Sequence, residues 1–255
     1  MNHSISCTYI GHATTFIKIG ETEFCTDPHF GKRTLTQKRH GELPIDPAEL
    51  PDFSAILLSH MHFDHLHVGS YKFISCKTPI IVPEGCERAV GRFTPNPIIE
   101  LSHYAKHTLA DGTEITAVPM KHHSFRVLPF RFTSCNGYLI QKPEVEGAVF
   151  YCGDSAYCEH FGEIGNLGKI KLAILPIGAY EPRWFMKSRH MNPEEAVQAF
   201  EDLKAEHMIP THYGTFRLSC ESPGAPAKRL GTILDQRSKL KSKVHILKPG
   251  EQFSA

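Results

Sequence analysis

Short runs of apolar and β-branched residues, separated by turn residues, occur along most of this chain. The first three runs are broken at residues 11–12 and 20–21, which is typical of an antiparallel meander. The later runs have the length and the β-branched content of buried strands. We therefore predict strands over residues 6–10, 14–19, 23–25, 55–58, 79–82, 115–118, 137–140, 148–152, 172–175, 207–209 and 244–247.

Helical signals are fewer, and the clearest begins at Asn192. Asn192 suits the N-cap, Pro193 suits the first helical position, and Glu195 completes a capping-box pattern. Further helices are predicted over residues 227–240 and 84–90. Because the helices are interspersed among groups of strands, the pattern favours an α/β (α+β) fold. We expect two sheets packed face to face with helices outside, in one domain over residues 1–255.

The composition is that of an ordinary globular protein, with 255 residues, 41% hydrophobic content and 22% charged content. The formal net charge is only +1, so a broad basic face is absent and we expect no nucleic-acid partner. No run approaches the roughly 20 apolar residues that span a bilayer, and residues 1–13 lack the pattern of a signal peptide. We therefore predict a cytoplasmic protein without a transmembrane segment.

The eight cysteines contain no Cys-x-x-Cys pair. This spacing argues against a structural zinc site and favours reduced, mostly buried thiols.

The strongest chemical signal is the hexapeptide HMHFDH at residues 60–65, which comes directly after a predicted strand. Residues two apart on extended backbone point the same way, so His60 and His62 can bind one metal ion. Asp64 and His65, in the loop beyond, can turn toward a second ion. The alternative is a chance cluster of histidines on a polar surface.

Three more polar residues follow apolar runs in the same manner, namely His122, Asp154 and His212. His123 competes with His122, because adjacent residues on extended backbone point in opposite directions. Together with the hexapeptide they would form two sites: His60, His62 and His122 for one metal, Asp64, His65 and His212 for the other, and Asp154 as a bridging carboxylate.

These motifs resemble those of metallo-β-lactamase-fold hydrolases, whose His-x-His-x-Asp-His signature stands at residues 60–65. Within that superfamily the chain closely resembles the N-acyl-phosphatidylethanolamine phospholipase D group, most specifically in the block LPIGAYEPRWFM. Matching segments lie at residues 11–14, 26–28, 153–155, 175–186, 192–197 and 211–216. The resemblance favours His122 over His123. The chain departs from the group at Phe63 and His67, where Tyr and Asp are usual.

The resemblance implies a four-layer αββα sandwich with two zinc ions at the sheet edges. It also implies hydrolysis of a lipid-like phosphodiester by a metal-bridging hydroxide, since zinc lowers the pKa of bound water to about 7. Asp64, which sits beside this hydroxide in the family, would orient it and accept its proton. Manganese or iron would also suit a set of His and Asp ligands.

For several other residues the sequence allows two different roles. Asp27 is interpreted as the hydrogen-bond partner of a ligand histidine, or else it caps the following turn. Arg183 and Trp184 are predicted to line the substrate site, with Arg183 holding phosphate and His190 protonating the leaving group. The alternative for this segment is a core plug with solvated charges. His12 is either a residue of the substrate pocket or a packed histidine bonded to backbone.

The leading hypothesis is a zinc-dependent, phospholipase D-like phosphodiesterase that acts on a small or lipid-linked phosphodiester. Peripheral membrane contact and the oligomeric state are left open. The alternative is a lactonase or other ester hydrolase, because the same metal set serves attack on a carbonyl. A nuclease is disfavoured by the lack of a basic face. A non-catalytic metal-binding protein is disfavoured by the complete ligand set.

Overall fold

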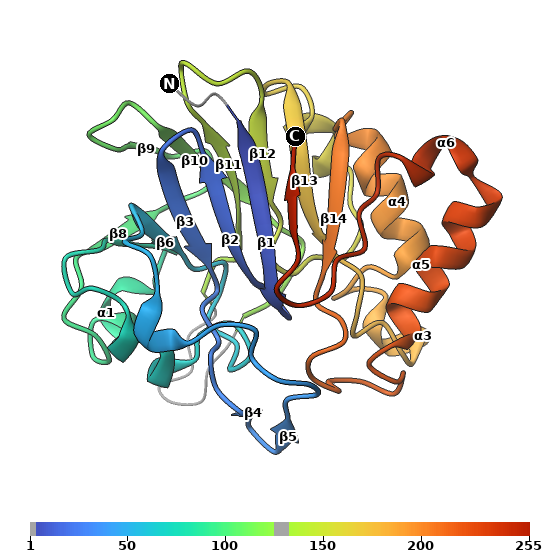
Figure 1. The fold of residues 1–255 in the computed structure, drawn as a ribbon, viewed down its shortest axis with the longest axis horizontal. Coiled ribbons are helices and arrows are strands. Elements are labelled where there is room, and N and C mark those ends of the chain that lie inside the picture. Colours follow the sequence, from blue (N-terminus) through green and yellow to red (C-terminus); the bar gives the residue numbers. More distant parts are fainter. Residues whose placement is uncertain (1–3, 125–132) are drawn as a thin grey trace.

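Two β-sheets packed face to face, with helices on both outer faces, make up the structure (Figure 1). It is a computed structural model that describes residues 4–124 and 133–255. One sheet has seven strands in the order β15-β1-β2-β3-β6-β7-β8, and the other has six in the order β14-β13-β12-β11-β10-β9. A separate two-stranded hairpin, β4-β5, projects from the lower edge of the view.

The strands of the first sheet are β1 (Ile5–Gly11), β2 (Thr14–Ile19), β3 (Thr22–Thr26), β6 (Ala55–Leu57), β7 (Ile80–Pro83), β8 (Ile98–Leu101) and β15 (Gln252–Ser254). Those of the second are β9 (Lys106–Thr108), β10 (Glu114–Pro119), β11 (Asn136–Gln141), β12 (Ala148–Tyr151), β13 (Ile170–Pro176) and β14 (His207–Thr211). The hairpin consists of β4 (Arg33–Thr34) and β5 (Gln37–Lys38).

The helices are α1 (Glu87–Val90), α2 (His160–Ile164), α3 (Arg183–Met186), α4 (Pro193–Asp202), α5 (Ala225–Gln236) and α6 (Ser238–Lys241), with two 3₁₀ turns at Pro47–Glu49 and Val68–Phe73. Among the residues described, no helix is both long and apolar enough to cross a bilayer.

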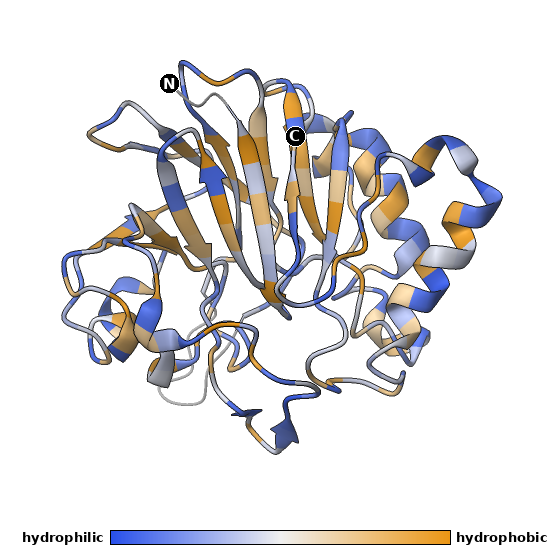
Figure 2. Cartoon of the chain, viewed as in Figure 1, coloured by the Kyte–Doolittle hydropathy of each residue, from blue (hydrophilic) through white to orange (hydrophobic). Residues whose placement is uncertain are grey.

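Three hydrophobic clusters hold the layers together. The central cluster joins the sheets, with Phe24 of β3 and Tyr138 of β11 both fully buried in it. A second cluster packs α2, α4 and α5 against the six-stranded sheet, and a third covers the other sheet near α1. In Figure 2 the outer helices alternate hydrophobic and hydrophilic positions, because only one side of each faces a sheet. The predicted order of helices, two sheets and helices is confirmed.

Helix α4 begins as its sequence predicts. The Asn192 side chain accepts a hydrogen bond from the backbone N–H of Glu195 at 2.9 Å. The Glu195 carboxylate accepts one in return from the N–H of Asn192 at 3.3 Å. This reciprocal capping box satisfies two helix N–H groups that otherwise lack partners.

Three predicted elements are wrong in extent or type. The helix over residues 227–240 breaks at Arg237, whose backbone leaves the helical region, into α5 and α6. Residues 244–247 make only an isolated bridge between Val244 and Met208 rather than a strand. The helix over residues 84–90 begins later, at Glu87. The short strands β4, β5, β8, β9 and β15 were not predicted, because edge positions and short lengths leave a weak hydrophobic pattern.

One edge of the sandwich collects the chemically interesting loops. Strands β3 and β6 run parallel, and so do β12, β13 and β14. Strand β10 has the same direction as β12, since each is antiparallel to β11. The carboxyl ends of β3 and β6 therefore lie at one edge of their sheet, and those of β10, β12 and β14 lie at one edge of the other sheet. The predicted ligands lie in the loops that follow β6, β10, β12 and β14.

Candidate metal centre

Three imidazoles from two sheets meet at a single point. Nδ1 of His62 lies 2.9 Å from Nε2 of His60 and 3.2 Å from Nε2 of His122. Oδ2 of Asp154 lies 3.8 Å from the Nε2 atoms of both His60 and His122. These four residues form a group whose ligand atoms all lie within 4.8 Å of one another.

A second group lies beside the first and shares Asp154 with it. Nε2 of His65 is 3.1 Å from Oδ2 of Asp154 and 3.4 Å from Oδ2 of Asp64. Nε2 of His212 is 3.3 Å from Oδ1 of Asp154 and 3.3 Å from Oδ2 of Asp64. All seven predicted metal ligands therefore lie in two adjoining groups with Asp154 between them.

The donor geometry of these groups fits metal ions. Tetrahedral zinc with Zn–N bonds of about 2.0–2.1 Å separates its ligand nitrogens by about 3.3 Å, close to the separations around His62. Nε2 of His212 and Oδ1 of Asp154 are buried and lack a hydrogen-bond partner of good geometry. Buried polar atoms rarely stay unsatisfied, and a cation between these groups would satisfy both.

The outer ring nitrogens of three of these histidines are fixed by hydrogen bonds. Nδ1 of His65 lies 2.5 Å from Oδ2 of Asp27, Nδ1 of His122 lies 2.9 Å from the carbonyl oxygen of Arg189, and Nδ1 of His60 lies 2.9 Å from the Ser59 hydroxyl. Donation of Nδ1–H to these partners leaves each Nε2 lone pair facing the centre, as metal ligation requires.

Asp27 is fully buried and collects four hydrogen bonds. Its Oδ2 accepts from the hydroxyls of Ser59 and Tyr151 and from His65, each at 2.5 Å. Its Oδ1 accepts from the backbone N–H of Ser59 at 2.7 Å. The structure thus places Asp27 where it orients His65. The two supporting residues, Ser59 and Tyr151, were not singled out from the sequence, because only the fold brings them to Asp27.

Electrostatics differ between the two groups. Burial lowers the pKa of His62 to about 4 and that of His60 well below its usual value, so both rings are neutral and able to bind metal. Burial also opposes charge on His212, but the neighbouring Asp154 and Asp64 raise the pKa of His212 to about 9. Burial raises the pKa of Asp154, but the surrounding histidines hold it well below its usual value. The carboxylates of Asp64 and Asp154 therefore favour positive charge in the second group, as on a bound metal ion.

His12 and His190 both reach this centre. Nε2 of His12 donates to Oδ2 of Asp64 at 2.8 Å, and the ring is 1% exposed. Nδ1 of His190 is buried without a hydrogen-bond partner and lies 3.8 Å from Oδ2 of Asp154. The His190 ring centroid lies 5.0 Å from that of His122.

Arg183 and Trp184 lie outside these groups. The Arg183 guanidinium donates to the carbonyl oxygen of His190 at 2.8 Å and pairs with the carboxylate of Glu195. It thus links the His190 segment to the start of α4. Trp184 is 85% exposed, so it is not part of a core plug.

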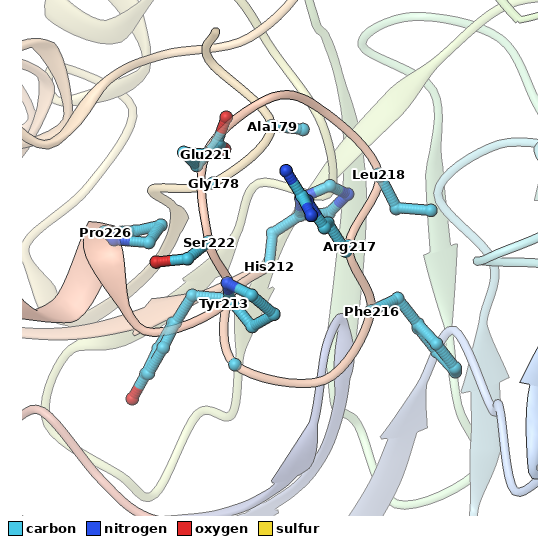
Figure 3. A pocket seen from close by; sticks show the side chains of 12 residues that line it. Gly178, Ala179, His212, Tyr213, Phe216, Arg217, Leu218, Glu221, Ser222 and Pro226 are labelled. Atoms are coloured by element: carbon cyan, nitrogen blue, oxygen red, sulfur yellow. The ribbon is translucent and has the colours of Figure 1, made fainter. Parts of the chain in front are cut away.

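The loop that follows His212 lies beside the candidate metal centre, and its residues 217–223 were not singled out from the sequence. Together with Gly178 and Ala179, residues of this loop line a small cavity of about 10 Å³ that includes His212 (Figure 3). Arg217, Leu218 and Glu221 of this loop contribute to its wall.

Close backbone contact fixes the position of His212. Its φ of 60° lies in the left-handed region, and its N–H donates to the carbonyl oxygen of His12 at 2.9 Å. A Cβ atom on Gly178 would lie 1.9 Å from the carbonyl oxygen of His212. Only glycine fits at position 178 while His212 keeps this place.

Comparison with known proteins agrees with this fold and site. A family model described as the beta-lactamase superfamily domain matches residues 22–213. The chain belongs to this superfamily. This beta-lactamase superfamily protein is 33% identical to the N-acyl-phosphatidylethanolamine-hydrolyzing phospholipase D 1 of Caenorhabditis elegans, over 92% of this chain and 71% of that protein. The resemblance inferred from the motifs is therefore confirmed.

Two further comparisons show how far the similarity extends along each chain. The superfamily member is 32% identical to a mitochondrial N-acyl-phosphatidylethanolamine-hydrolyzing phospholipase D of Saccharomyces cerevisiae, over 89% of this chain but only 51% of that protein. A metallo hydrolase from the archaeon Ignicoccus hospitalis has the same fold, with a TM-score of 0.73 at 21% identity over 99% of this chain and 98% of that one. The protein is a metal-dependent hydrolase of the metallo-β-lactamase fold.

Proposed function

We propose that this protein is a dinuclear, zinc-dependent phosphodiesterase with phospholipase D-like activity. One observation carries the proposal: the carboxylate of Asp154 lies within 3.8 Å of ring nitrogens in both groups of ligand atoms, and each group is drawn from both sheets. Two adjoining ions are the arrangement that hydrolyses phosphoric diesters in many enzymes. The named activity of the worm and yeast relatives supports the phosphodiester.

The residues divide into two ligand sets. His60, His62 and His122 would hold one ion, and Asp64, His65 and His212 the other, with Asp154 shared between them. Zinc suits the tetrahedral spacing at His62, and manganese or iron suits the same donor types. Bound zinc would lower the pKa of water to about 7 and polarise a phosphoryl oxygen.

Asp64 would act as the proton acceptor for the attacking water. Its Oδ2 is within 2.8 Å of Nε2 of His12 and within 3.4 Å of both His65 and His212. These three imidazoles fix the carboxylate and hold the pKa of Asp64 well below its usual value, against the opposing effect of burial. His12 would therefore orient Asp64, in addition to lining the substrate site.

His190 would donate a proton to the leaving oxygen. Its unpartnered Nδ1 lies near Asp154, next to where a phosphodiester would bind. Burial lowers the pKa of His190 to about 3, so the ring is neutral in the free protein, and proton donation would require the bound anionic phosphodiester to raise that pKa first. The guanidinium of Arg183 would support the step indirectly, since it holds the carbonyl oxygen of His190.

Peripheral membrane contact is part of this proposal. Trp184 and Phe185 of α3 are 85% and 45% exposed, and the Arg189 guanidinium lies 4.2 Å from the Phe185 ring centroid. Aromatic rings interspersed with cations suit an anionic lipid surface. Because Trp184 is the single tryptophan, its emission should shift to the blue with anionic vesicles, and unchanged emission would contradict membrane contact at α3.

The cytoplasm is the proposed location. All eight cysteines are free in the structure, in keeping with a reducing compartment.

Hydrolysis of bis(p-nitrophenyl) phosphate by the zinc-loaded protein tests the proposal, with Asp64→Ala as the comparison. We expect turnover in the wild type, loss of at least about 100-fold in the variant through loss of base and ligand, and about two bound zinc ions per chain. Turnover of a lactone panel without phosphodiester turnover would instead establish the ester hydrolase alternative.

A further inference from the structure

A groove with a cavity of about 880 Å³ lies between the β4-β5 hairpin and the segment that follows the hairpin. Residues 30–33 and 38–39 line it from the hairpin, and residues between 41 and 47 line it from the following segment. The hairpin is the one that projects from the lower edge of the molecule in Figure 1. The volume is within the range of about 300–1,000 Å³ that is usual for small-molecule sites.

Apolar side chains form much of the groove lining. Phe30 is buried and belongs to the hydrophobic cluster near α1. Leu43 and Ile45 pack against the same cluster but remain partly exposed, and they alternate with exposed residues at positions 42, 44 and 46. Pro47 lines the groove beyond them. An apolar ligand in the groove would therefore cover side chains that the fold leaves only half-buried.

The charge around the groove is positive. Its lining contains four cations, at positions 32, 33, 38 and 39, against two carboxylates, at positions 42 and 46. The Asp46 carboxylate caps a 3₁₀ turn, where it accepts a hydrogen bond from the backbone N–H of Ala48 at 2.9 Å. Of the carboxylates that the structure describes, none forms an ion pair with Lys32, Arg33 or Lys38. This balance favours a ligand that joins an apolar chain to an anionic group.

Arg39 connects the groove to the candidate metal centre. Its guanidinium donates to two backbone carbonyl oxygens, at 2.5 and 3.1 Å, and its Cζ lies 5.1 Å from the Phe216 ring centroid. That centroid lies 5.3 Å from the ring centroid of His12, whose Nε2 is 2.8 Å from Oδ2 of Asp64. One phenyl ring and one imidazole thus separate this lining residue from a predicted metal ligand. A phosphodiester at the centre could extend an attached chain past Phe216 into the groove.

We propose that this groove binds the alkyl or acyl chain of an amphiphilic phosphodiester, with Leu43 and Ile45 in contact with the chain and Arg39 beside its polar end. The inference rests on the proposed function and names the substrate class that the site would prefer, a phosphodiester with one long apolar group. The preference would come from burial of the chain, because each methylene removed from water favours binding.

Hydrolysis of methyl and decyl p-nitrophenyl phosphate, which differ only in the alkyl chain, tests the groove at concentrations below micelle formation. In the zinc-loaded wild type we expect KM to be at least about 100-fold lower for the decyl ester. The double variant Leu43→Gln/Ile45→Gln should reduce this ratio about tenfold, and either single change should reduce it less.

Leu167→Gln is the matched control. Leu167 is 46% exposed and lies between α2 and β13, outside the groove. It should keep the wild-type ratio of KM values. The same ratio in the control, the double variant and both single variants would overturn the proposal.

Calorimetric binding of decyl phosphate separates this inference from the proposed function. If the zinc-loaded wild type hydrolyses neither ester, the proposed function is wrong, and the groove is then judged by binding alone. Binding of decyl phosphate about tenfold weaker in the double variant than in Leu167→Gln would support the groove. Equal binding in the two proteins would contradict it. A wild-type dimer that the double variant converts to monomers in sedimentation would also overturn it, since the groove would then be a contact between two copies of the chain.

Discussion

At the residue scale, the metal-ligand pattern could be read from the sequence because its members are close together in the chain. Four of the seven predicted ligands lie within residues 60–65, and a strand before them fixes their direction. Asp27 left two interpretations open, because its partner His65 is 38 residues away and only the fold brings them within 2.5 Å. Arg183 was assigned to phosphate for the same reason, since its partner Glu195 lies on another helix.

Replacing Asp27 by asparagine should weaken zinc binding at the His65 group. An amide has one acceptor oxygen and no charge, so its NH₂ group would face either the Ser59 N–H at the Oδ1 position or the three donors at the Oδ2 position, and the His65 ring would lose its anionic partner. We expect zinc affinity to fall about 10- to 100-fold, measured by competition with a chelator.

Asp235→Asn serves as the control, because Asp235 pairs with Lys241 on the surface. An Asp27→Asn protein that keeps wild-type zinc affinity would show that Asp27 merely caps its turn.

At the element scale, the long buried strands were predictable and the connections were not. The central strands carry continuous apolar runs, so their predicted limits agree with the structure within about two residues. Residues 244–247 have the same composition but pair with the rest of the molecule through only one bridge. Composition does not encode whether a neighbouring strand has a free edge.

Two glycine substitutions should have opposite effects on stability. Gly178→Ala places a methyl group 1.9 Å from the carbonyl oxygen of His212, so it should destabilise the fold by about 1–3 kcal/mol and displace that ligand. Gly231→Ala lies within α5 with no atom within 4 Å of the new Cβ, and should stabilise by about 0.5–1 kcal/mol. Urea denaturation and zinc content measure both.

The two glycine variants serve as each other's control. Retention of wild-type stability and two zinc ions in Gly178→Ala would contradict the close approach of β14 and the segment that follows β13.

At the scale of the whole molecule, the sandwich was expected from the interspersed helices and from the resemblance to a known family. The position of the loop of residues 213–223 was not expected, because it depends on Glu221 accepting hydrogen bonds from two backbone N–H groups of another loop. Contacts of this kind depend on tertiary structure and leave no periodic pattern in the sequence.

The reactivity of the cysteine thiols tests how well the layers of the fold are packed. Cys76 and Cys220 are exposed and Cys158 is half-buried, whereas the other five cysteines are buried. We expect two fast-reacting thiols and one slower thiol toward a disulfide reagent at pH 8, with the other five reacting only after unfolding. Fast reaction of more than three thiols in native protein would contradict this packing.

The buried thiols also predict lower stability at alkaline pH. Burial raises the pKa of Cys7 and Cys86 from 9.0 to about 12. Because the folded state holds these protons more tightly, their contribution to stability is present below pH 9 and is lost as the pH rises toward 12. Denaturation at pH 8 and pH 10 should show a loss of about 1.4 kcal/mol per thiol. This loss should be smaller in Cys7→Ala and unchanged in Cys76→Ser.

Both ligand groups draw their members from the two sheets. His60, His62, Asp64 and His65 follow β6 of the seven-stranded sheet, whereas His122, Asp154 and His212 follow β10, β12 and β14 of the other. Each bound ion would thus cross-link the two halves of the sandwich at their shared edge, as a disulfide does in a secreted protein. The same ions that support catalysis would keep the halves of this disulfide-free chain in register, and chelation should loosen the whole sandwich as well as stop the reaction.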